Sequence, residues 1–68
     1  MPVKLTNQVQ KLRAAAQLTQ EQLAEAVGVT RQTIIAIEKG NYTPSVLLAL
    51  KLSFVFKKSV ETIFSYEK

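Results

Sequence analysis

The sequence predicts an all-α fold, in which five helices pack into one small domain covering residues 1–68. Three observations predict it. Apolar residues recur at three- and four-residue steps, as they do along a helix that buries one face. Hydroxyl side chains stand where helix N-caps are needed, at Thr19, at Thr30, at either Ser45 or Thr43, and at Ser59. Glycine follows two of the expected helices, at Gly28 and Gly40, where a left-handed residue can end a helix.

The five helices are expected to follow one another without a linker, an internal repeat or a low-complexity segment between them. Their expected ranges are 8–17, 20–27, 31–39, 46–56 and 60–64. In the first of them, the side chains expected to face inward are Val9, Leu12 and either Ala15 or Ala16. The second should open with a capping box, because Gln22 stands three residues after Thr19.

Composition agrees with one small domain and narrows the classes of function. A hydrophobic content of 47% can bury a core, although a chain of 68 residues buries a lower fraction of its surface than a longer one. The absence of cysteine excludes a disulfide framework, a thiolate zinc site and a thiol nucleophile. Histidine, the usual general base and commonest metal ligand, is also absent. We therefore expect no enzymatic activity, no metal, no cofactor and no small-molecule ligand.

Charge and hydropathy bear on the partner and on the compartment. Nine lysines and arginines against five acidic residues give a net charge of +4, which favours a polyanionic partner without identifying one. The first residues, Met1–Thr6, contain no apolar core of the kind found in signal peptides. The longest apolar stretch, residues 46–56, contains Lys51 and is too short to span a bilayer. We expect a cytoplasmic protein that does not contact membranes.

Residues 20–37, QEQLAEAVGVTRQTIIAI, have the spacing of a helix-turn-helix unit. Ala24 falls where two helices must approach closely, and Gly28 falls where the chain must turn. Ile34 and Ile37 recur on what would be the buried side of the second helix. A unit of this kind is short and stiff, and it can present the first turn of its second helix to the edges of base pairs. The sequence therefore predicts a protein that reads double-stranded DNA.

The segment LTQEQLAEAVGVTRQTIIAIEKGNYTPS resembles the Cro/repressor (xenobiotic-response-element, XRE) family of helix-turn-helix regulators, in particular its short bacterial members. The resemblance combines the cap, the spacing, the turn glycine, GVTRQTI, E-K-G and a following proline, and it extends from Lys11 to Phe64. It implies a sequence-specific transcriptional regulator, most simply a repressor. In some small members the chain ends pair as an antiparallel ribbon at the dimer interface, and here Val3–Leu5 and Ser65–Glu67 are partly β-prone.

The resemblance places the outer side of the helix at 31–39 in the major groove. Arginine can donate two hydrogen bonds to guanine and glutamine can pair with adenine, each worth about 1–3 kcal/mol of base discrimination, although most arginines and glutamines are simply solvated. The expected base-contacting residues are Arg31, Gln32, Thr33, Ile35 and Ala36. Ile35 departs from the polar residue usual in the family, so it either contacts thymine methyl groups or leans on the core.

Contacts with phosphates should flank these side chains. Gln20 begins a helix, where free backbone N–H groups and the helix dipole attract an anion. The family also uses the loop after the reading helix to grip the DNA backbone. The expected phosphate contacts are Gln20, Thr30, Lys39, Asn41 and Tyr42. The resemblance further implies an ion pair between Arg13 and Glu38, which would set the angle of the reading helix and would not read bases.

The helix at 46–56 carries more apolar side chains than one buried face requires. We expect the following to be buried: Val46, Leu48, Ala49, Leu50, Leu52, Val55 and Phe56. Leu47 and Phe54 then add a stripe, shared with Lys51 and Lys58, which indicates either a contact surface or a wider core. The residues expected at a homodimer interface are Leu47, Phe54, Ile63, Phe64 and Tyr66.

A homodimer would read an inverted repeat whose half-sites lie about 34 Å apart, one turn of DNA. The alternative is an antitoxin-like protein-interaction module, in which Leu47, Phe54 and Tyr66 bind a partner protein. The residue after the same helix, Lys57, stands where the family often has glycine or asparagine. If that turn is left-handed, we expect it to be strained by about 1 kcal/mol.

Overall fold

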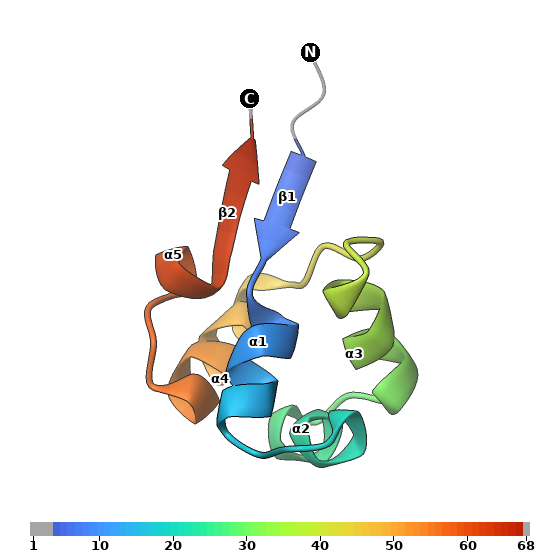
Figure 1. Cartoon of the computed structure of the whole chain (residues 1–68). Helices are drawn as coiled ribbons and strands as arrows, with labels where there is room; N and C mark the ends of the chain where they lie inside the picture. The colour runs from blue at the N-terminus through green and yellow to red at the C-terminus, as the bar shows by residue number, and fades with distance from the viewer. Residues whose placement is uncertain (1–3, 68) are drawn as a thin grey trace.

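The computed structural model of the protein describes residues 4–67. Five helices are present in this range, and the first and last elements are short strands that pair with each other. In chain order the elements are β1 (Lys4–Asn7), α1 (Val9–Ala15), α2 (Gln20–Val27), α3 (Arg31–Glu38), α4 (Val46–Phe56), α5 (Val60–Ile63) and β2 (Phe64–Glu67). In Figure 1 the strands project side by side from one end of the helical body, and both termini lie at that end. The predicted five-helix fold with a terminal ribbon is confirmed.

The helices enclose one hydrophobic core. Its buried residues come from every helix and from the first residue of β2: Val9, Leu23, Ala24, Val27, Ile34, Ile37, Leu48, Leu52, Ile63 and Phe64. Among residues 4–67 no polar or charged residue is fully buried. None of the helices in this part of the chain is long and apolar enough to cross a membrane.

The predicted caps begin four of the five helices. The hydroxyl of Thr19 accepts a hydrogen bond from the backbone N–H of Gln22 at 3.0 Å, and the Gln22 side chain accepts one from the N–H of Thr19 at 2.9 Å. This is the expected capping box. Three further hydroxyls cap the helices that follow them, those of Thr30, Ser45 and Ser59. The starts of these helices are therefore determined locally by side chains visible in the sequence.

The first helix is shorter than predicted. It ends at Ala15, and Gln17 takes a left-handed conformation with φ of 60°. That turn brings Leu18 against the core, where it is half-buried. Ala15 and Ala16 are both exposed, so the expectation that one of them faces inward is wrong.

The terminal ribbon is antiparallel, with Leu5 opposite Tyr66 and Thr6 opposite Ser65. The hydroxyls of Thr6 and Ser65 lie 2.8 Å apart and add a side-chain hydrogen bond to the ladder. Where the ribbon meets the body, Asn7 donates from its side-chain amide to the carbonyl of Ile37 at 2.9 Å. Val3, which was expected in the ribbon, lies outside the described residues, as do Met1, Pro2 and Lys68.

Only one side of α4 is buried. Leu48 and Leu52 enter the core, whereas Val46 and Leu50 are 77% and 55% exposed, so the expectation that these two are buried is wrong. A helix packed against one layer buries the side that faces that layer and leaves the opposite side in solvent. Val46 and Leu50 share that opposite side with Phe54, which is 84% exposed.

The residue that follows α4, Lys57, is left-handed with φ of 55°, which is the condition under which strain was expected there. Replacing it by glycine removes the clash between Cβ and backbone, and we expect Lys57→Gly to raise the free energy of unfolding by about 1 kcal/mol. Lys58→Gly is the matched control, because Lys58 does not have a positive φ and should lose stability. Urea denaturation of both variants checks the prediction, and equal effects would contradict it.

Candidate nucleic-acid interface

The turn between α2 and α3 is closed by backbone hydrogen bonds at Gly28. Gly28 is left-handed with φ of 74°, and its N–H bonds to the carbonyl of Glu25. The N–H of Val29 reaches back to the carbonyl of Ala24 at 3.0 Å. These two bonds make a Schellman motif, which satisfies carbonyls left free at the helix end. Ala24 is 3% exposed in the core, and α2 and α3 pack directly against each other.

The two sides of α3 have different surroundings. Ile34 and Ile37 are at most 1% exposed and pack the inner side of the helix into the core. Arg31 and Gln32, in the first turn, are exposed, while the remaining expected base contacts are half-buried: Thr33, Ile35 and Ala36. The hydroxyl of Thr33 lies 3.2 Å from that of Thr30 at the cap, so it takes part in starting the helix. The side of α3 that carries Arg31 and Gln32 faces away from the core, and the opposite side is packed into it.

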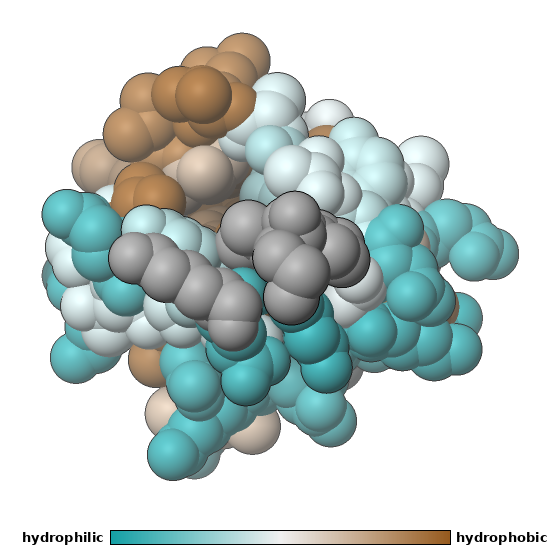
Figure 2. Space-filling view, turned by 90° about the horizontal axis from the view of Figure 1, so that it is seen from above, coloured by the Kyte–Doolittle hydropathy of each residue, from teal (hydrophilic) through white to brown (hydrophobic). Residues whose placement is uncertain are grey.

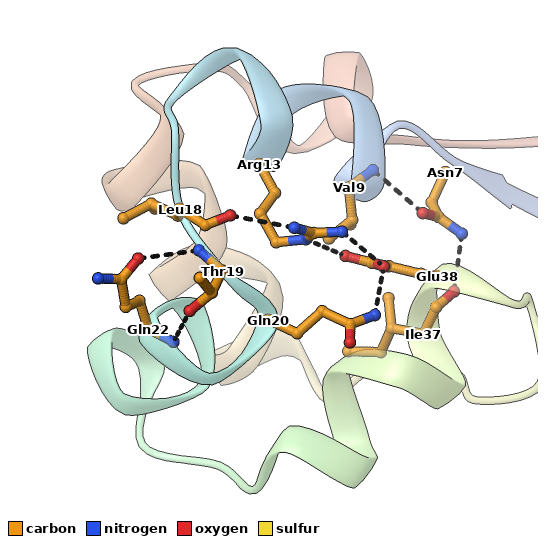
Figure 3. Close-up of polar contacts among 9 residues, drawn as sticks. All are labelled: Asn7, Val9, Arg13, Leu18, Thr19, Gln20, Gln22, Ile37 and Glu38. Atoms are coloured by element: carbon orange, nitrogen blue, oxygen red, sulfur yellow. Dashed lines mark hydrogen bonds and ion pairs between the residues drawn. The ribbon is translucent and has the colours of Figure 1, made fainter.

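Arg13 and Glu38 are joined across the domain, from α1 to the last residue of α3 (Figure 3). Arg13 Nε lies 2.7 Å from Glu38 Oε2, and its Nη2 donates to Oε1 at 3.3 Å. A third nitrogen of Arg13, Nη1, donates to the carbonyl of Leu18 at 3.0 Å. The side chain of Glu38 is 6% exposed and that of Arg13 is 16% exposed. The ion pair is bidentate and largely shielded from solvent, so it restrains the position of the C-terminal end of α3 relative to α1.

Gln20 takes part in the same cluster, which the sequence did not reveal. Its Nε2 donates to Glu38 Oε1 at 3.0 Å, so its amide points toward the ion pair in Figure 3. A phosphate contact from Gln20 therefore depends on its backbone N–H group at the start of α2. An open recess runs in front of this helix end, and Arg31 lines its other side. The first turns of α2 and α3 thus border one shared hollow.

The other expected phosphate contacts lie at the two ends of α3. Thr30 is exposed at its start, and Lys39, Asn41 and Tyr42 are exposed after its end. The backbone N–H of Asn41 donates to the carbonyl of Ala36 at 2.9 Å, which holds the loop against the helix. The structure therefore brings polar and basic groups to both ends of the exposed side of α3.

The expected interface residues divide into two groups. Leu47, Phe54 and Tyr66 are exposed, at 63%, 84% and 60%. Ile63 and Phe64 are instead part of the chain's own core, at 0% and 9% exposed. The side chain of Ile63 is not available to a second molecule, so the expectation that it contacts one is corrected, whereas Phe64 lines a surface recess and remains a candidate for that contact. The sequence could not show that these residues differ from Tyr66. Ile63 ends α5 and Phe64 begins β2, so neither lies within a repeating pattern from which its burial could be predicted.

The fold and the exposed first turn of α3 define a helix-turn-helix domain. The helix-turn-helix family profile matches residues 9–67. The chain is 52% identical over 64 residues to the HTH-type transcriptional regulator YgzD of Bacillus subtilis, covering 94% of this chain and 97% of that one. A regulator of Methanocaldococcus jannaschii is also 52% identical, over 63 residues, with 93% and 96% covered. An HTH-type regulator of Archaeoglobus fulgidus is 42% identical over 64 residues, with 94% and 90% covered.

The chain belongs to the XRE-type helix-turn-helix family. The family and the names of these relatives support DNA-binding transcription regulation as its function.

Proposed function

We propose that this protein represses transcription by binding, as a homodimer, to an inverted-repeat operator, with α3 of each copy in the major groove. The observation that carries the proposal is that Arg31 and Gln32 are exposed on a helix whose opposite side is buried. On that side, Ile34 and Ile37 are at most 1% exposed. Base readout requires side chains that are free to bond on a backbone that does not move. Occlusion of a promoter is the simplest way for such a domain to regulate.

We assign different tasks to different parts of this surface. Arg31 and Gln32 read base edges, with Thr33, Ile35 and Ala36 completing the contact along the groove. Gln20, through its backbone, and Thr30, Lys39, Asn41 and Tyr42 hold phosphates on either side. The net charge of +4 supports the electrostatic part of this binding, which releases counterions and weakens as salt rises. Because the partner is DNA, we place the protein's action in the cytoplasm.

A dimer is proposed because one helix touches too few base pairs for useful selectivity. Two copies related by a twofold axis read half-sites about 34 Å apart. The exposed apolar side chains of α4 support a contact between copies, since monomeric proteins rarely expose large contiguous apolar patches. Tyr66 lies in β2, one of the two strands of the terminal ribbon, and it is exposed. It is a further candidate for that contact.

The test is footprinting and quantitative binding on DNA upstream of the protein's own gene, across a salt series. Gln32→Ala should lose about 1–3 kcal/mol of discrimination between operator and mutated sites, because its amide reads a base. Lys39→Ala should weaken binding to all sequences alike and lower the salt slope by about one. Protection of two half-sites about one turn apart is expected for the wild type.

Gln22→Ala is the control for Gln32→Ala, because Gln22 is an exposed glutamine whose side chain caps α2 away from the exposed side of α3. It should leave discrimination unchanged. Equal losses for Gln32→Ala and Lys39→Ala on every sequence would refute the division into base and phosphate contacts. Absence of any protected site would refute the proposed operator.

A further inference from the structure

Hydrophobic side chains gather on one side of the molecule and surround a hollow there (Figure 2). The outer side of α4 supplies four large exposed apolar residues, which we call the α4 patch: Val46, Leu47, Leu50 and Phe54. Three of them, Val46, Leu50 and Phe54, recur every four residues and form one row along the helix. Leu50 is the midpoint of this row, with Val46 and Phe54 at equal distances on either side.

A recess lies at the Val46 end of the row. It has a volume of about 180 Å³ and is lined chiefly by apolar side chains from β1, the loop before α4, α4 itself, α5 and the start of β2: Leu5, Pro44, Val46, Ala49, Val60 and Phe64. At the other end of the same row, Phe54 projects with 84% of its surface exposed. One helix therefore carries a projecting aromatic ring at one end and an apolar recess at the other.

We propose that a second copy of this chain covers the α4 patch, with the two α4 helices antiparallel across a twofold axis at Leu50. In that arrangement each Phe54 lies opposite the partner's Val46 and enters the partner's recess. A twofold contact requires one surface to be complementary to itself, and a ring and a recess equidistant from the axis meet that requirement. The inference rests on the homodimer in the proposed function and specifies which surface forms it.

The exposed area suits a reversible dimer. From typical side-chain areas, the α4 patch contributes about 450 Å² per copy, or about 900 Å² for two. Specific interfaces bury about 1,200–2,000 Å² in all, and weaker ones less. The recess walls add only a little to this area, so the contact belongs with the smaller and weaker interfaces. We therefore expect a dimer that exchanges at micromolar concentration, with Phe54 as its main anchor.

The charges next to the row are complementary in this arrangement. Lys57 and Lys58 follow Phe54 at the end of α4, and both are exposed. Glu61 follows Val60, a wall of the recess, and it too is exposed. Insertion of Phe54 brings the basic end of one copy toward the part of the partner's recess next to Glu61, whereas the wall residue Leu5 is preceded by the exposed Lys4. Such rim charges contribute to orientation more than to affinity.

The chain contains no cysteine, so single cysteines report the interface without background. Leu50→Cys places two thiols at the axis, where they can approach closely enough for a disulfide, and mild oxidation should link copies covalently. Lys51→Cys is the matched control, because position 51 is also exposed but points about 100° further round the helix. We expect Leu50→Cys to form linked dimers at least about ten times faster than Lys51→Cys.

Sedimentation equilibrium on Phe54→Ser gives a second measurement, with Lys51→Ser as the control. Phe54 is largely exposed, so the variant should keep the wild-type circular dichroism while its dimer dissociation constant rises at least about tenfold. If the wild type is dimeric but the two cysteine variants link at equal rates, or Phe54→Ser dimerises normally, this interface is wrong and the proposed homodimer stands. If the wild type stays monomeric while protecting a single half-site, the homodimer fails as well.

Discussion

Arg13→Ala is expected to lower the free energy of unfolding by about 3 kcal/mol, because it leaves the shielded carboxylate of Glu38 without its cation. The Glu38 side chain is 6% exposed, and Gln20 would be its one remaining side-chain donor. The same substitution removes the bond from Nη1 to the carbonyl of Leu18. Since the pair fixes the end of α3, operator binding should fall with stability. Guanidinium denaturation measures the first effect, and binding at a temperature where the variant is folded measures the second.

Lys11→Ala is the control for Arg13→Ala, because Lys11 is an exposed cation on the same helix. It should change stability by less than about 0.5 kcal/mol, as surface substitutions usually do. If Arg13→Ala lowered the free energy of unfolding by less than about 1 kcal/mol, this pair would contribute no more to stability than an exposed ion pair does. The ion pair would then not be what holds α3 in place.

Ala24→Leu is expected to cost about 3 kcal/mol, since overpacking a filled core forces side chains and backbone apart. Ala24 is 3% exposed at the contact between α2 and α3, so the added atoms have to separate these helices. The Schellman turn that starts from the Ala24 carbonyl would move with them. We expect a lower midpoint in urea and a larger loss of operator binding than the stability change alone produces.

Ala26→Leu is the matched control for Ala24→Leu: the same substitution on the same helix, at an exposed position. It should leave stability within about 0.5 kcal/mol of the wild type. If Ala24→Leu and Ala26→Leu behaved alike, the closeness of α2 and α3 at this position would not be a constraint on the fold.

Local signals explain why so much of this fold could be predicted. Cap hydroxyls at Thr19, Thr30 and Ser45, and the turn glycine Gly28, act on neighbouring residues, so their effects can be read within a few positions of the chain. The first helix was predicted less well, because its end depends on a left-handed Gln17, a residue that gives no such signal. The exposure of Arg31 and Gln32 followed from the periodicity of the isoleucines on the opposite side of α3.

What sequence reasoning missed depends on contacts between distant elements. Gln20 and Glu38 are 18 positions apart, and nothing local indicates that the amide of Gln20 bonds to that carboxylate. Val46 and Leu50 look like core residues by type, and their exposure depends on which neighbours α4 acquires. Ile63 was placed at an interface for the same reason, although the chain itself covers it.

The amide of Asn7 connects parts of the molecule that are far apart in the chain. Its nitrogen bonds to the carbonyl of Ile37, and its oxygen accepts from the N–H of Val9 at 3.1 Å. One residue further, the N–H of Gln8 bonds to the carbonyl of Ile63 at 2.8 Å. The two strands of the terminal ribbon are thus fastened to each other at their inner ends, and β1 is also fastened to the end of α3. Displacement of β1 would therefore act on the end of α3 directly, without passing through the hydrophobic interior.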